Sequence, residues 1–189
     1  MRYKYETRGI VLRRSPLGEA NVFVVLLTHD LGLVRARVQG LRLSGAKLAS
    51  SLKTFAESEV VLVRGKEGWR IAGAVLKEDW FALLRSQEAR SRAARVSDLL
   101  MRLVAGEAND SVLFPVIKGF FNALSKTEDD LQEAAEMLAA IRILSVLGFD
   151  EENVQEEASV FTEQLLSEVI RDRTRYIARI NNSINTSGL

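Results

Sequence analysis

The fold is decided by three short apolar runs near the start of the chain: Gly9-Ile-Val-Leu-Arg-Arg14, Val22-Phe-Val-Val-Leu-Leu-Thr28 and Leu33-Val-Arg-Ala-Arg-Val38. Two turn sequences separate them, Pro16-Leu-Gly-Glu-Ala20 and Asp30-Leu-Gly32. Proline and glycine favour tight turns, and the runs between them are rich in β-branched residues. The pattern therefore predicts three consecutive strands, with alternate side chains of residues 22–27 facing the core.

Two more strand signals follow at residues 55–64 and 69–76, joined by the turn Gly65-Lys-Glu-Gly68. A polar loop at residues 40–51 precedes them. Five strands in so short a segment fit a small Greek-key barrel, and the OB-fold is such a barrel with a nucleic-acid function. We therefore expect a five-stranded OB-fold barrel over residues 1–79.

The periodicity changes after residue 79. Apolar residues then recur at three- and four-residue steps, the spacing of amphipathic helices. This spacing predicts helices over residues 79–105, within 110–124, from Thr127 to Gly148, and from about 159 to 180. Thr127 can cap the third helix, and Gly148 can end it in a left-handed conformation. The chain is thus expected to be α+β, with an all-helical domain over residues 80–189 that ends in a flexible tail, residues 181–189.

Composition excludes several kinds of site. The 189 residues include no cysteine and one histidine, so disulfides, thiolate zinc sites and histidine metal clusters are not expected. The longest apolar run, residues 22–27, is far shorter than the roughly 20 residues of a membrane helix. The first residues do not resemble a signal peptide. We expect a cytoplasmic protein with no membrane association, no metal and no cofactor.

Charge is divided unevenly along the chain, although the formal net charge is only +1. Residues 1–80 carry 14 Lys and Arg against 8 Asp and Glu, whereas residues 81–189 carry 12 against 17. A basic segment attracts polyanions and an acidic one repels them. The first half is therefore expected to bind nucleic acid or an acidic peptide.

The candidate DNA-binding residues begin with Arg35 and Arg37, which share one face of the third predicted strand. A row of cations can neutralise successive phosphates, and an aromatic ring can stack on bases. The alternative is a strand face that is only solvated. The other candidates are cations near this strand in sequence and one aromatic residue proposed for stacking: Arg13, Arg14, Arg42, Lys47, Lys53 and Trp69.

A second basic cluster lies near the end of the acidic half, at Arg171, Arg173, Arg175 and Arg179. We expect it on one side of the last helix, where it could bind phosphates or the acidic tail of a partner protein. A solvated helix face is the alternative. Residues 151–157 read as an acidic connector, and Ser44 with Lys47 has no oxyanion motif beside it. We therefore expect no catalytic residues and no enzyme activity.

The first 80 residues also resemble a known family. The matching elements, in order, are Thr7-Arg-Gly-Ile-Val-Leu-Arg-Arg14, Leu17-Gly-Glu-Ala20, Leu26-Leu-Thr28, Gly32-Leu-Val34, Gln39-Gly-Leu-Arg42 and Lys47-Leu48. Their order and spacing are similar to those of RecO, a bacterial recombination mediator and DNA repair protein. Leu147-Gly-Phe149 is similar to the point at which members of that family often continue into a zinc finger.

This resemblance implies an N-terminal OB-fold packed on a helical domain, binding of single- and double-stranded DNA, and strand annealing. It also implies cooperation with RecR in displacing single-stranded DNA-binding protein, so that RecA can load. The acidic tail of the single-stranded DNA-binding protein is the partner implied for the helical domain. The chain departs from the family pattern because it lacks the four cysteines of the finger and its helical half is acidic.

Two other functions stay open from the residues alone. The same barrel chemistry would permit a binding module for structured RNA. A structural adaptor whose barrel binds only protein is the second alternative. The sequence favours a DNA-binding mediator of recombinational repair, with the barrel neutralising phosphates and the helices docking protein partners.

Overall fold

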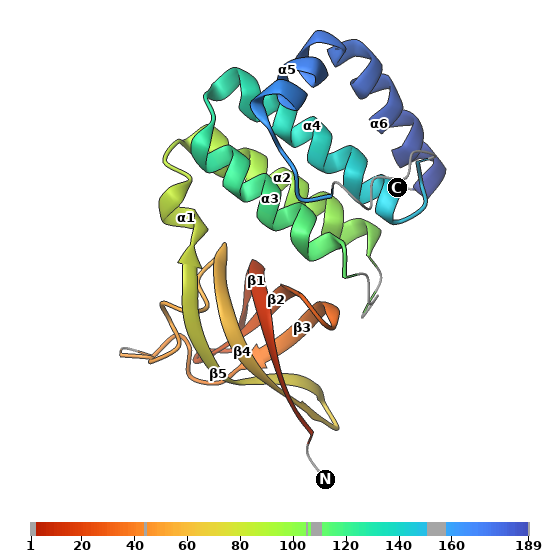
Figure 1. Ribbon diagram of the computed structural model, residues 1–189. Helices are drawn as coiled ribbons and strands as arrows, with labels where there is room; N and C mark the ends of the chain where they lie inside the picture. Colours follow the sequence, from red (N-terminus) through yellow and green to blue (C-terminus); the bar gives the residue numbers. More distant parts are fainter. Residues whose placement is uncertain (1–2, 44, 105, 107–110, 151–157, 189) are drawn as a thin grey trace. The chain divides into compact units, whose positions relative to one another are not determined.

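The computed structural model describes residues 3–43, 45–104, 106, 111–150 and 158–188. Its elements fall into two compact units, one with the strands up to Ala82 and one with the helices from Leu83 onward. The first unit is a β-barrel and the second is made of helices (Figure 1). The predicted fold class, an OB-fold barrel followed by a helical domain, is confirmed. The acidic residues 151–157 and Ser44 lie outside the described residues.

Five strands close the barrel in the order β1-β2-β3-β5-β4. The strands are β1 (Lys4–Leu17), β2 (Asn21–Thr28), β3 (Gly32–Val38), β4 (Ala56–Gly65) and β5 (Gly68–Asp79). All neighbours are antiparallel except β3 and β5, which pair in parallel over Ala36↔Trp69 and Arg37↔Arg70. The long strand β1 pairs with two strands: its first half with β4 and its second half with β2.

The barrel interior is filled by alternate residues of its strands. Val22, Val24 and Leu26 of β2 belong to this core, and Val24 and Leu26 are fully buried. The predicted inward alternation along β2 is therefore confirmed. Leu27, on the opposite face, is also fully buried, so the end of β2 is covered on both sides.

A buried carboxylate joins the barrel to the turn of helix that follows it. Glu57 of β4 is almost completely buried and accepts a hydrogen bond of 3.1 Å from the indole Nε1–H of Trp80. The guanidinium of Arg8 lies 3.8 Å from the same carboxylate. Trp80 begins the single-turn helix α1 (Trp80–Leu83), and its own ring is buried. Because a buried charge needs such partners, this contact fixes where β5 ends.

The helical unit is built around α4. Its helices are α2 (Gln87–Leu103), α3 (Leu113–Lys126), α4 (Asp129–Val146), α5 (Glu163–Arg171) and α6 (Arg173–Ser187). Every residue of α4 from Met137 to Leu144 is buried, and this helix contacts α2, α3, α5 and α6. A helix that is buried all round belongs at the centre of its unit. None of the described helices is long and apolar enough to cross a membrane.

Three helix boundaries differ from the expected ones. The helix expected over residues 79–105 is divided into α1 and α2, and Ser86 caps α2 by accepting a 3.0 Å hydrogen bond from the Ala89 N–H. The helix expected over 159–180 is divided into α5 and α6 at Asp172. The segment 181–189, expected as a tail, is part of α6 as far as residue 187.

Two helix caps were predicted from the sequence near α3 and α4. The one at Thr127 is wrong, and the one at Gly148 is confirmed. The Thr127 hydroxyl donates to the Ala123 carbonyl at 2.9 Å, so Thr127 closes α3 and does not cap α4. Glu128 precedes α4 instead, without a side-chain capping bond. At the other end, Gly148 has φ 79° and the Phe149 N–H donates to the Leu144 carbonyl at 2.8 Å. This is the expected left-handed termination.

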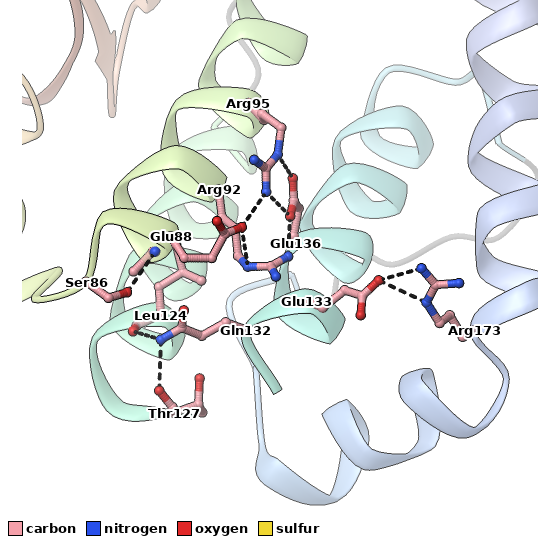
Figure 2. Close-up of polar contacts among 11 residues, drawn as sticks. Ser86, Glu88, Arg92, Arg95, Leu124, Thr127, Gln132, Glu133, Glu136 and Arg173 are labelled. Atoms are coloured by element: carbon pink, nitrogen blue, oxygen red, sulfur yellow. Dashed lines mark hydrogen bonds and ion pairs between the residues drawn. The ribbon is translucent and has the colours of Figure 1, made fainter. Parts of the chain in front are cut away.

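Ion pairs hold α2 against α4 (Figure 2). The Glu136 carboxylate of α4 accepts hydrogen bonds from Arg92 at 2.7 Å and from Arg95 at 2.6 Å and 2.8 Å. Glu88, which lies in α2 like the two arginines, is 3.4 Å from Arg92 and 3.2 Å from Arg95. Hydrogen bonding to Glu136 raises the pKa of Arg95 above its ordinary value. Glu136 is thus the acceptor on which the two helices converge.

We expect Leu26→Asp to unfold the barrel, because it places an unpaired charge in the core and should cost several kcal/mol, a large part of the stability of an ordinary domain. Val75→Asp is the matched control, since Val75 is 61% exposed on β5. Thermal unfolding followed by circular dichroism measures both. A cooperative, parent-like transition for Leu26→Asp would show that β2 is not a core strand.

Glu136→Gln is expected to destabilise the helical unit by about 1–3 kcal/mol, because two arginines lose a charged acceptor that is only 19% exposed. Glu88→Gln removes the same charge from a half-exposed position and should change stability by less than about 1 kcal/mol. Urea denaturation of the two variants compares them directly. Equal effects would contradict the central role of Glu136.

Candidate nucleic-acid interface

The two arginines of β3 lie on the outer face of the barrel. Val34, Ala36 and Val38 alternate with them and are buried in the barrel core. Side chains alternate between the two faces of a strand, so Arg35 and Arg37 both point outward. Arg35 is exposed, and no acidic side chain pairs with it among the described residues.

The strand register brings two more arginines to the same face. Arg35 lies opposite Val25 of β2, and Val25 lies opposite Arg13 of β1. Arg37 lies opposite Arg70 of β5. Neighbouring strands are about 4.8 Å apart, so Arg37 and Arg70 are adjacent, whereas Arg13 and Arg35 lie two strand spacings apart with Val25 between them. The four cations share one band of the barrel wall. We call it the arginine strip: Arg13, Arg35, Arg37 and Arg70.

The strip ends at a hollow beside the β4–β5 hairpin. This hollow has a volume of about 840 Å³. Gly65 and Gly68 pair at the end of the hairpin, and Gly68 has φ +95°, a conformation that suits glycine at this turn. The charged and aromatic residues of its lining are Arg37, Arg64, Lys66, Glu67, Trp69 and Arg70. We call it the basic hollow, because four cations and one carboxylate line it.

The loop after β3 stays close to this end of the barrel. The Arg42 guanidinium donates to the Gly18 carbonyl at 2.8 Å, and the Arg42 N–H donates to the Ala20 carbonyl at 3.1 Å. Arg42 therefore fastens the loop to the β1–β2 turn, and it remains exposed. Lys47 is also exposed, whereas Arg14 is half-buried.

Lys53 is not brought together with the other candidates. It forms an ion pair with Asp79, the last residue of β5. Arg70 lies near the start of the same strand, about 30 Å away at the usual rise per strand residue. The geometry therefore separates Lys53 from the arginine strip and gives it a local partner.

Trp69 does not provide the exposed stacking surface that the sequence suggested. It is 7% exposed and belongs to the barrel core. Its ring meets Tyr5 edge-on at 5.2 Å between centroids, and the Arg64 guanidinium lies 5.1 Å from its centroid. The parallel pairing with Ala36 turns the tryptophan inward. It supports the floor of the basic hollow and is too covered to receive a base.

The turn between β2 and β3 carries negative charge instead. The Thr7 hydroxyl donates to Asp30 Oδ2 at 2.6 Å, and His29 Nδ1 lies 2.8 Å from Oδ1. The hydrogen bond from Thr7, and then that from His29, lower the pKa of Asp30. This carboxylate stays ionised at neutral pH, so the cationic surface does not extend to this turn.

The second predicted cluster is divided by the break at Asp172. Arg171 ends α5, whereas Arg173, Arg175 and Arg179 belong to α6. Arg173 binds Glu133 of α4 at 2.8 Å, and Arg179 forms an ion pair with Asp150 (Figure 2 shows the first). The four arginines therefore do not form one patch on one helix. Arg171 and Arg175 remain as exposed cations.

Three hollow-lining cations were missed by reasoning from sequence: Arg64, Lys66 and Arg70. Arg70 lies 33 residues after Arg37, and only the parallel β3–β5 pairing makes them neighbours. Lys66 lies in a segment that the sequence predicts as a turn. The sequence does contain a signal for this cluster of cations, because Arg64 and Arg70 lie on either side of the turn and Lys66 lies within it.

Comparison with known proteins identifies the barrel. The family model described as "Recombination protein O N terminal" matches residues 1–77. A protein named DNA repair protein RecO from Dehalococcoides mccartyi (strain ATCC BAA-2266 / KCTC 15142 / 195) is 27% identical over 150 residues, which are 79% of this chain and 58% of that protein. The protein of the same name from Gloeobacter violaceus is 27% identical over 145 residues, 76% of this chain and 55% of that protein.

A third relative, from Heliobacterium modesticaldum, is also named DNA repair protein RecO and is 28% identical over 77% of this chain and 52% of that protein. The matches to these three relatives span little more than half of each relative's length. They nevertheless extend beyond the barrel into the helical unit, since each covers about 150 residues of the chain. With its closed five-stranded barrel and the helices that follow, the chain is similar to RecO proteins over most of its length, and its residues 1–77 match the model of the N-terminal part of that family.

Proposed function

We propose that this protein is a non-enzymatic DNA-binding protein of DNA repair, and that its barrel binds the sugar-phosphate backbone. The observation that carries the proposal is the arginine strip, which spans the four neighbouring strands β1, β2, β3 and β5 and ends in the basic hollow. Cations placed at intervals along one surface suit a polymer with one charge per nucleotide. The relatives named DNA repair protein RecO support the biological setting.

Binding through this surface would be largely independent of base sequence. Its cations lie on strands and a hairpin, so no recognition helix enters a groove. Trp69 is buried and offers no stacking platform. Single- and double-stranded DNA would both be ligands, and strand annealing follows if two strands are neutralised on one surface.

The helical unit is the proposed docking site for protein partners. Arg171 and Arg175 are exposed, and Arg175 borders a hollow of about 510 Å³ together with Asp150 and Asn182. A pair of arginines suits the acidic tail of a partner. On the family pattern, the partners would be RecR and single-stranded DNA-binding protein, with RecA loading as the result.

Affinity for DNA should fall steeply with salt. If four to six phosphates are neutralised, affinity for a single strand should drop by about three to four powers of ten for each tenfold rise in salt. Fluorescence anisotropy with a labelled 20-nucleotide strand at several salt concentrations measures the slope. A matched RNA strand tests the alternative of an RNA-binding module, and an affinity that does not change with salt would contradict phosphate binding.

Charge reversal should locate the surface. Arg35→Glu combined with Arg70→Glu should weaken DNA binding by about tenfold or more, because two phosphate contacts become repulsive. Neither side chain is buried, so the melting temperature should change little. Arg171→Glu combined with Arg175→Glu is the control with the same change of net charge, and it should weaken protein partners more than DNA. Equal loss of DNA binding in both variants would place the interface elsewhere.

A further inference from the structure

The basic hollow has an unbalanced charge. Four of its lining residues are cations, Arg37, Arg64, Lys66 and Arg70, and Glu67 is its one carboxylate. Arg37 and Arg70 are direct neighbours in the β3–β5 ladder, where like charges repel. In the part of the chain that the structure describes, neither Lys66 nor Arg70 has a carboxylate partner. The hollow therefore attracts further negative charge.

Glu67 stands where an external anion would bind. Its Oε2 lies 2.5 Å from Nη2 of Arg37. A carboxylate and a phosphate use the same hydrogen-bond donors of a guanidinium, so one can replace the other. Glu67 is thus an internal substitute for a phosphate group on Arg37.

The contact between Glu67 and Arg37 is easy to break. The Glu67 side chain is 77% exposed and that of Arg37 is 37% exposed. Exposed pairs of this kind contribute only about 0–1 kcal/mol. Glu67 also sits at the tip of a hairpin, between Gly65 and Gly68. A phosphate brought in by a bound strand can displace it.

The shape of the hollow favours a single strand. Its volume of about 840 Å³ is within the range of ordinary ligand pockets. A duplex is a convex and stiff rod, so its phosphates reach a concave surface only at the rim. A single strand is flexible and can bend a phosphate into the hollow.

We infer that the basic hollow is a phosphate subsite for single-stranded DNA, and that Glu67 competes with the incoming phosphate for Arg37. This inference rests on the proposed function of the barrel and adds a residue that limits its affinity. Glu67 reduces binding of weak anions to the hollow, and a polyanion held along the arginine strip displaces it.

Glu67→Gln tests the competition. The variant should bind a 20-nucleotide thymidine strand about two- to fivefold more tightly than the parent, which is the factor that corresponds to an exposed ion pair. In an Arg37→Gln background the same substitution should give no gain, because the group that Glu67 covers is absent. The gain should be smaller on a 20-base-pair duplex. Fluorescence anisotropy at low and moderate salt measures all of these affinities.

Glu59→Gln is the matched control. Glu59 is an exposed carboxylate of β4 that pairs with Lys77 and does not line the hollow, so its removal changes net charge equally. A gain from Glu67→Gln that is no larger than that from Glu59→Gln, or one that persists without Arg37, would overturn the inference while the parent still binds DNA. If the parent binds no strand at all, the proposed function and this inference both fail.

Discussion

The parallel pairing of β3 with β5 is the contact on which the rest of the barrel depends. It includes only two residue pairs, Ala36↔Trp69 and Arg37↔Arg70, yet it closes the sheet. The first pair directs Trp69 into the core, and the second sets two arginines side by side on the outer face. The same two residue pairs therefore place a core side chain inside the barrel and two charges outside it, because successive pairs along a strand face opposite sides.

The closure also explains why a surface with adjacent like charges is tolerated. Arg37 and Arg70 repel each other, but the core below them includes Val24, Leu26 and Leu62, all fully buried. Burial of such side chains contributes about 1.5–3 kcal/mol each, which exceeds the repulsion between two solvated charges. The Glu67 carboxylate reduces this repulsion further. A polyanion would complete the neutralisation, so binding and relief of repulsion act in the same direction.

The strands and the outward face of β3 could be predicted from sequence because both depend on local alternation, as at Val34, Arg35 and Ala36. Contacts between distant residues could not. Arg37 and Arg70 meet through a pairing that no local pattern specifies, and the burial of Trp69 follows from it. In the helical unit, the ion pairs of Arg173 with Glu133 and of Arg179 with Asp150 join residues far apart in sequence. The sequence alone does not distinguish an exposed arginine from one that is held in an ion pair.

Arginine has a different role in each of the two units. On the helices, Arg92 and Arg95 form hydrogen bonds with Glu136 that fix α2 against α4, and this carboxylate of the protein itself offsets their charge. On the barrel, Arg35 and Arg70 have no acidic partner among the described residues, and their charge is directed outward. An arginine with an internal partner loses most of its attraction for phosphate, because the nearby carboxylate cancels its field. The distribution of carboxylates, more than that of arginines, therefore decides which surface binds a polyanion. Glu67 is an intermediate case, because it pairs with Arg37 but the pair is exposed.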